Sequence, residues 1–252
     1  TQSKSLLGAD MTVSGNTPIP ESLAMSLDSL QAEQSSEIEL FSMSYLPAID
    51  ESQFVRVVGL TGGFPYYGEL LTEPAAASTT YQSGSYALVD DGMLLQYGLS
   101  VGDSIKLGKV TFAIHGRLLN AFGSIDAGTS FAPSVYIAGT KMRDTDLLQP
   151  GSLVNYTQYY KTAPDIDLDQ WKKVRRQQFR NASQRITTIQ DQRENLQEAF
   201  ANLNSFLNIV ALISLLLACI GVASSVLIYV KTKVQSIAIL RCLGMKSQEA
   251  FA

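Results

Sequence analysis

The 252-residue sequence has little charge and few reactive side chains. Charged residues make up 17% of it, against about a quarter of a typical soluble domain. It has one histidine, His115, and two cysteines, Cys219 and Cys242. We therefore expect neither a disulfide framework nor a Cys/His zinc cluster. The formal net charge of −4 gives no case for nucleic-acid binding.

The same scarcity argues against an active site. His115 lies in an expected strand without an identifiable partner, so we interpret it as a surface or packed residue and not as a general base. The glycine- and aromatic-rich stretch 62–68 lacks the lysine and the helix start of a phosphate-binding loop. We therefore expect no catalytic residue, no cofactor and no metal, and ATP hydrolysis would have to come from another polypeptide.

One long apolar run stands out against this background. Residues 206–230 form 25 positions without a charge, and a helix needs about 20 to cross the hydrocarbon core of a membrane. A helix buried in a globular core is the alternative, but such helices seldom exceed ~14 uninterrupted apolar residues. The sequence therefore predicts one transmembrane helix over 206–230.

Small residues gather within this predicted helix at Gly221, Ser224 and Ser225. Small side chains let helices approach closely in lipid, so we expect this face to pack against other membrane helices. The alternative is an ordinary, tolerated glycine.

The charges that flank the run predict its direction. The side chains that follow it are mostly basic, namely Lys231, Lys233, Arg241 and Lys246. By the positive-inside rule, residues 231–252 face the cytoplasm and residues 1–205 lie outside the cell's inner (cytoplasmic) membrane.

Residues 1–190 are expected to form an extracytoplasmic domain of the α+β class. Alternating and β-branched patterns predict strands near 10–14, 38–46, 54–60, 86–90, 134–138 and 186–189, and a β-hairpin over 99–116. Residues 75–85 are small and polar and are expected to form a mobile excursion. A helix from about Asp165 to about Phe179 has a basic face, which we interpret as solvated surface, with a ligand site as the alternative. Its basic residues are Lys172, Lys173, Arg175, Arg176 and Arg180.

From Asp191 the pattern is helical and contains no proline up to the end of the apolar run. A helix over 191–230 would be about 60 Å long at ~1.5 Å per residue, and only about half of it fits in a bilayer. The sequence therefore predicts a stalk helix over 191–205 that joins the outer domain to the membrane and transmits motion.

Several motifs resemble one family of membrane proteins. The run SIAILRCLGM at 236–245 resembles the segment that follows the second membrane helix of MacB/FtsX/LolC-type ABC transporter permeases. The run LSVGDSIKLG at 99–108 resembles the hairpin of that family's extracytoplasmic domain. Residues 57–60 and 64–70 are similar to the YbbP-like branch of this FtsX-like permease family. The resemblance covers residues 40–252.

The resemblance implies a fragment of a permease subunit that covers the extracytoplasmic domain and the second membrane helix. It implies two small α/β lobes outside the membrane and a separate cytoplasmic ATPase as partner. Carried over by position, residues 231–252 contain the segment that couples to the ATPase, and Ser236 stands where many members have an acidic residue. The implied coupling residues are Val234, Ile237, Ile239, Leu240, Arg241 and Gly244.

Some alternatives stay open at this stage. Val234, Ile237 and Leu240 share a helix face that Gly244 would end, and this face suits either docking or an interfacial helix on anionic lipid. The chain could instead belong to a single-span sensor or binding module, or to a membrane-tethered hydrolase. A periplasmic partner or a lipid-like cargo is a further expectation. The aromatic candidates for cargo contact, or for simple packing, are Phe64, Tyr66, Tyr67, Tyr159 and Tyr160.

Overall fold

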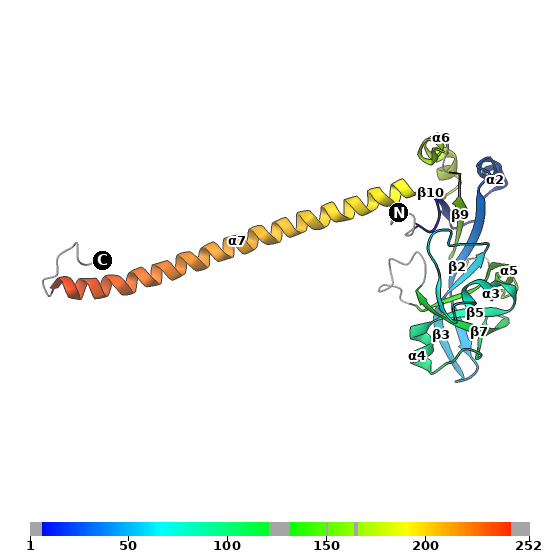
Figure 1. The fold of residues 1–252 in the computed structure, drawn as a ribbon, viewed down its shortest axis with the longest axis horizontal. Coiled ribbons are helices and arrows are strands. Elements are labelled where there is room, and N and C mark those ends of the chain that lie inside the picture. The colour runs from blue at the N-terminus through cyan, green and yellow to red at the C-terminus, as the bar shows by residue number, and fades with distance from the viewer. Residues whose placement is uncertain (1–6, 121–131, 150, 164–165, 243–252) are drawn as a thin grey trace. The chain divides into compact units, whose positions relative to one another are not determined.

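The computed structural model describes residues 7–120, 132–149, 151–163 and 166–242. The chain divides into two compact units, Thr1–Glu194 and Asn195–Ala252. The first unit contains all the strands of the described residues and the shorter helices, and the second is formed by most of one long helix (Figure 1).

A ten-stranded mixed sheet organises the first unit. Its strands follow the order β10-β1-β9-β2-β3-β8-β5-β7-β4, and β6 pairs with β2 and β7. The pairs β3–β8 and β5–β7 are parallel, and the other pairs are antiparallel. The strands are β1 (Met11–Gly15), β2 (Glu33–Leu46), β3 (Glu51–Thr61), β4 (Leu71–Glu73), β5 (Tyr86–Asp90), β6 (Ser104–Leu107), β7 (Val110–Asn120), β8 (Ser134–Ala138), β9 (Val154–Lys161) and β10 (Gln184–Thr188).

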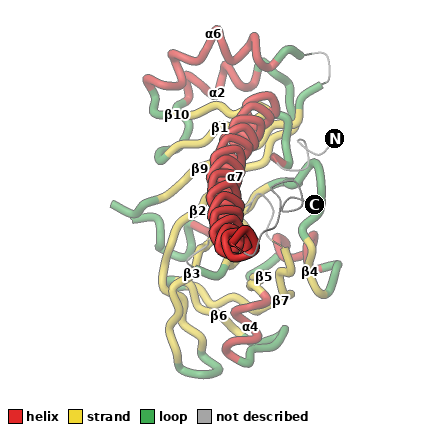
Figure 2. Tube along the Cα trace, turned by 90° about the vertical axis from the view of Figure 1, so that its left-hand side faces the viewer, coloured by secondary structure: helices red, strands yellow, loops and turns green. Residues whose placement is uncertain are grey.

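Helices lie against the two ends of this sheet (Figure 2). One end carries α2 (Glu21–Asp28) and α6 (Leu168–Asn181), whose buried Leu23, Leu27 and Phe179 share a core with β1 and β9. The other helices of the first unit are α3 (Ala77–Thr80), the 3-10 helix η1 (Tyr81–Ser83), α4 (Asp91–Tyr97) and α5 (Gly139–Met142). The long helix is α7 (Ile189–Cys242).

The expected α+β class is confirmed, and the sheet has separate cores at its two ends. A larger core lies between β2, β3 and the β6–β7 hairpin and includes Val57, Phe112 and Val135. The long strand β2 pairs with β9 toward one end and with β3 and β6 toward the other. The two ends are therefore parts of one continuous sheet, where the family resemblance implied two small lobes.

Local signals explain several element boundaries. The Asp90 carboxylate accepts a hydrogen bond from the Met93 N–H and so caps the start of α4, and Gly98 ends this helix at a φ of 65°. In the β6–β7 hairpin, Leu107 pairs with Val110 across a two-residue turn that begins at Gly108. The predicted hairpin is thus confirmed.

The expected excursion at residues 75–85 is wrong. The segment forms α3 and η1, because Ala77 and Tyr81 are fully buried in a third apolar cluster with Leu70 and Tyr136. The small and polar composition of this segment is typical of a loop, but the buried Ala77 and Tyr81 fix the segment against the sheet.

Candidate functional site: the long helix and its first turn

Helix α7 carries the predicted membrane span. Among the described residues, it is the one helix that is long and apolar enough to cross a membrane. Its large apolar side chains are exposed, for example Phe206 at 61%, Leu217 at 65% and Ile228 at 67%. Such a continuous apolar surface is unfavourable in water and suits the hydrocarbon core of a bilayer.

The three small residues predicted to pack against other helices lie together on α7. Gly221, Ser224 and Ser225 are spaced i, i+3 and i+4, so they share one face of the helix. All three are exposed, and within the described ranges no other element covers them. Their role in packing stays a prediction.

The predicted coupling residues up to Arg241 lie on the same helix as the predicted span. Val234 and Ile239 are 57% and 64% exposed, and Ile237 is half-buried. The backbone of Leu240 and Arg241 belongs to α7, while their side chains, and all of Gly244, lie outside the described residues. The span and most of the coupling segment therefore form one uninterrupted helix up to Cys242.

A reciprocal cap begins this helix. The Asp191 carboxylate accepts a hydrogen bond from the Thr188 N–H at 2.6 Å, and the Thr188 hydroxyl accepts one from the Asp191 N–H at 3.4 Å. This arrangement is a capping box, which satisfies N–H groups that a helix start otherwise leaves without partners. The helix begins directly after β10, with no loop between them.

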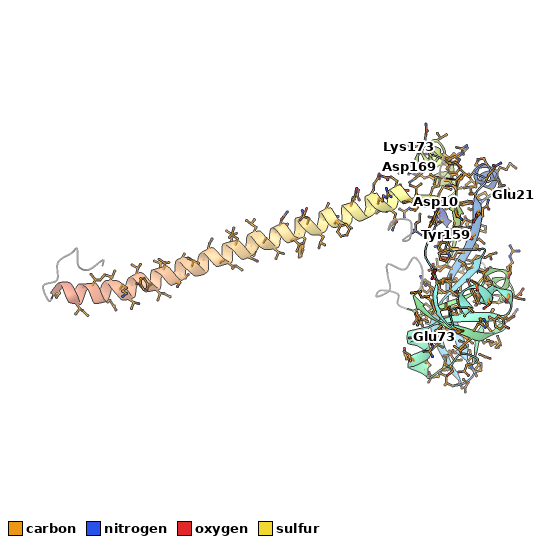
Figure 3. All side chains as sticks on the ribbon, in the orientation of Figure 1. Asp10, Glu21, Glu73, Tyr159, Asp169 and Lys173 are labelled. Atoms are coloured by element: carbon orange, nitrogen blue, oxygen red, sulfur yellow. The ribbon has the colours of Figure 1, made fainter. Side chains whose placement is uncertain are left out.

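Two side chains of α6 reach this cap. The Lys172 ammonium lies 2.5 Å from both carboxylate oxygens of Asp191. The Thr188 hydroxyl donates a hydrogen bond to the Asp169 carboxylate at 2.9 Å. Figure 3 places Asp169 at the N-terminal part of α6, one residue after the start of the helix. We call Asp169, Lys172, Thr188 and Asp191 the α6–α7 clamp.

The electrostatics of the α6–α7 clamp favour the ionised carboxylate. Burial alone would raise the pKa of Asp191, but hydrogen bonds from Lys172 and from the N–H and hydroxyl of Thr188 outweigh it. The pKa of Asp191 is therefore lowered. All four residues lie in the unit Thr1–Glu194, so the first turn of α7 is fixed to the unit that contains the sheet.

Most of the aromatic candidates for cargo contact are packing residues. Phe64 is 6% exposed and stacks on Tyr159 with ring centroids 3.7 Å apart. The Tyr67 hydroxyl donates to the Asp10 carboxylate, Tyr66 hydrogen-bonds Ser35, and Tyr160 is 1% exposed in the core of α2 and α6. These contacts hold the stretch 62–68 against the strands β1, β2 and β9.

A carboxylate lies beneath this aromatic stretch. Tyr159 donates a hydrogen bond to Glu37 at 3.1 Å. Burial raises the pKa of Glu37 to about 7, and the nearby Glu39 adds to the rise. The Tyr159 hydrogen bond and the Arg56 charge act in the opposite direction.

An exposed apolar patch lies on one face of the β2–β3 pair. Phe41 and Phe54 stack with centroids 5.7 Å apart and are 49% and 45% exposed. Met43 is 54% exposed and lies opposite Phe54 in the strand register. Sequence reasoning did not single out this β2–β3 patch, although alternating apolar residues along Phe41, Met43 and Tyr45 could have indicated it.

His115 has no carboxylate neighbour among its described contacts. Its Nε2 lies 2.8 Å from the Thr80 hydroxyl, and its ring stacks on Tyr86 at 4.4 Å. Within the described part of the chain, no three His, Cys, Asp or Glu side chains are grouped to hold a metal ion.

Comparison with known proteins adds to this geometry. The chain is 26% identical over 243 residues to the uncharacterised ABC transporter permease YbbP of Escherichia coli. The aligned residues make up 96% of the chain. The chain resembles an ABC transporter permease. This match confirms the resemblance predicted from the motifs. The chain spans 29% of the length of YbbP, and no protein-family model matches it.

Solved structures of low sequence identity also match. The periplasmic region of MacB from Actinobacillus actinomycetemcomitans aligns with 77% of this chain and 95% of its own, at a TM-score of 0.45 and 13% identity. The extracellular domain of the transporter YknZ from Gram-positive bacteria aligns over 71% of this chain and 100% of its own length, at a TM-score of 0.44 and 10% identity.

The clamp residues were missed at the sequence level. A threonine followed three residues later by an aspartate, as at Thr188 and Asp191, is a recognised signal for a helix start. Lys172 was grouped with the solvated basic face of its helix, because the sequence does not show which of the neighbouring cations contacts α7.

Proposed function

We propose that the chain is a segment of a MacB/FtsX-like permease subunit of an ABC transporter. In this proposal it transmits ATP-driven conformational changes from a separate cytoplasmic ATPase to its own extracytoplasmic domain. The observation that carries the proposal is the similarity to a permease over 96% of the chain. The exposed apolar surface of α7 agrees with a subunit that lies in a membrane.

The charge distribution supports one orientation. Residues 1–205 lie outside the membrane, with an extracytoplasmic domain over 1–190 and a stalk over 191–205. Residues 206–230 span the membrane, and residues 231–252 lie in the cytoplasm, where their basic side chains are favoured. Other membrane helices of the same permease would cover the face of Gly221, Ser224 and Ser225.

The coupling segment supports docking to the ATPase. Val234 and Ile239 are exposed apolar side chains beyond the span, on a helix that continues to Cys242. In the cytoplasm such side chains need a protein partner or a lipid surface to cover them. Together with Ile237, Leu240, Arg241 and Gly244 they form the contact in this proposal.

The cargo belongs to the same proposal. We infer export or extraction of a hydrophobic, lipid-like or peptide molecule, or contact with a periplasmic partner. The β2–β3 patch supports this inference, because stacked and exposed aromatic rings are typical of interaction surfaces.

The test uses the full-length permease reconstituted in lipid nanodiscs with its ATPase. The wild-type permease is expected to change the ATPase rate. Ile237→Asp and Leu240→Asp place a charge in the apolar contact, and we expect each to reduce this effect by about 10-fold or more, because burying an unpaired charge is costly.

Gln235→Asp is the matched control, because it adds the same charge to the same helix on a different face from Ile237 and Leu240. Equal loss in all three variants would contradict the assigned contact. A wild-type permease that leaves the ATPase unaffected would contradict the proposed function and favour the single-span sensor.

A further inference from the structure

We propose that the α6–α7 clamp is the mechanical joint that makes the extracytoplasmic domain follow the movement of α7, with Lys172 and Asp169 as its positioning residues. This inference rests on the proposed function and deepens it, since it names the side chains through which the stalk acts on the domain.

The argument begins with the connection between β10 and α7. Thr188 ends the strand and Ile189 begins the helix, so the backbone joins them at a single point. A single point transmits a pull along the helix but allows the helix to tilt or rotate about it. A second attachment, away from the backbone, is needed to transmit a tilt.

Helix α6 supplies that second attachment. Lys172 lies 19 positions before Asp191 in the chain, yet its ammonium contacts both carboxylate oxygens at 2.5 Å. Asp169, one helical turn earlier, accepts from Thr188 at 2.9 Å. The two contacts hold the last residue of the strand and the first turn of the helix at the same time.

Helix α6 is itself fixed to the core. Phe179 is 1% exposed, and Trp171 packs against its edge with ring centroids 5.9 Å apart. Leu168 and Trp171 contact the cluster that contains Met11, Tyr160 and Ile186 of the sheet. A force applied at Asp191 is therefore carried into β1, β9 and β10, and not into a loose surface helix.

The Lys172–Asp191 pair is also better sheltered than an ordinary surface ion pair. Its side chains are 18% and 29% exposed, against 40% and 65% for Lys161 and Glu33, which lie 3.3 Å apart. Hydrogen bonds between ionised partners are shorter and about twice as strong as neutral ones, and partial burial reduces their screening by salt. The pair can thus hold under load where an exposed pair contributes little.

The test compares neighbouring lysines in the full permease with its ATPase in nanodiscs. Lys172→Met removes the charge and keeps an unbranched side chain of nearly the same length. Lys173→Met is the matched control, because Lys173 is exposed and forms no ion pair with the described residues. Lys172→Arg is the conservative variant that restores a cation.

Two readouts separate coupling from folding. One is the ATPase rate, and the other is the nucleotide-dependent change in distance between spin labels at the exposed Leu153 of the domain and Phe200 of the helix. Cys219 and Cys242 are replaced by serine for this labelling. The thermal unfolding midpoint of each variant shows whether the domain is intact.

We expect Lys172→Met to keep the wild-type ATPase rate and to reduce the nucleotide-dependent change in label distance about 5-fold or more, the low end for coupling between distant sites. The distribution of label distances should also become broader. Lys173→Met and Lys172→Arg should behave like the wild type. Asp169→Ala, which removes the acceptor of the Thr188 hydroxyl, provides a second variant with the same expected direction if Lys172→Met does not fold.

Two results would overturn the inference in different ways. A normal distance change in both Lys172→Met and Asp169→Ala would overturn the clamp and leave the proposed function intact. A wild-type permease without any nucleotide-dependent distance change or effect on the ATPase would overturn the proposed function and the clamp together.

Discussion

At the scale of single residues, Glu37 gives the sheet a dependence on pH. Its pKa in the folded domain, about 7, lies above the ordinary value of 4.5 for a glutamate side chain. The folded state therefore holds this proton more tightly than the unfolded chain does. The contribution of protonated Glu37 to the stability of the folded domain is complete below pH 4.5 and is lost as the pH rises through 7.

Glu37→Gln should remove this dependence. The neutral amide avoids the burial of a charge, so we expect the variant to be more stable than the wild type at pH 8 by about 1–3 kcal/mol, and little changed at pH 4. Thermal unfolding of the chain in detergent at both pH values measures the difference. Glu69→Gln, at an exposed position, serves as the control, and equal pH profiles of wild type and Glu37→Gln would refute the prediction.

Thr188 contributes to stability at the same scale. Thr188→Val keeps the shape of the side chain and removes the hydroxyl, so it leaves the Asp191 N–H without its capping partner and Asp169 without its donor. We expect a loss of about 1–2 kcal/mol, typical of a helix N-cap, while Thr188→Ser should stay near the wild type. Faster hydrogen exchange at the first turn of α7 would report the loss. Thr187→Val is the control, and an identical effect at both positions would argue against the cap.

At the scale of elements, the sequence predicted the structures that depend on local patterns. The β6–β7 hairpin follows from alternation about Gly108, and α7 follows from an unbroken helical pattern without proline. The prediction of a mobile excursion at residues 75–85 was wrong, because the burial of Tyr81 depends on strands that are distant in the sequence. The position of Lys172 could not be predicted for the same reason, since it depends on how α6 packs beside β10.

The continuity of α7 is testable as an element. Ala199→Pro and Ala201→Pro together should interrupt its hydrogen bonds between the sheet and the span, because each proline costs about 3 kcal/mol in a helix interior. We expect ATPase activity to persist and the nucleotide-dependent distance change to be lost, as measured between spin labels at the exposed Leu153 and at the exposed Leu203, which lies beyond the prolines. Ala199→Gln and Ala201→Gln keep the helix and form the control. A wild-type distance change in the proline variant would show that a rigid stalk is not required.

At the scale of the whole molecule, composition predicts the membrane helix and motifs predict the resemblance to ABC transporter permeases. A stretch of 25 uncharged residues has few alternatives in a water-soluble fold, so the prediction of the span depends on length alone. The strand order of the sheet could not be predicted in the same way. It brings β1 beside β10 and β9, and these pairings join segments more than 140 positions apart.

That pairing has a consequence for how the domain is attached. Met11 lies opposite Thr188 in the register of β1 and β10, so the chain enters and leaves the sheet at one corner. A module whose two connections are neighbours can be excised or exchanged as a cassette, with a short turn bridging the cut, because the flanking chain need not change its path. Replacing the segment between Met11 and Thr188 would therefore leave the start of α7 at Ile189 in place.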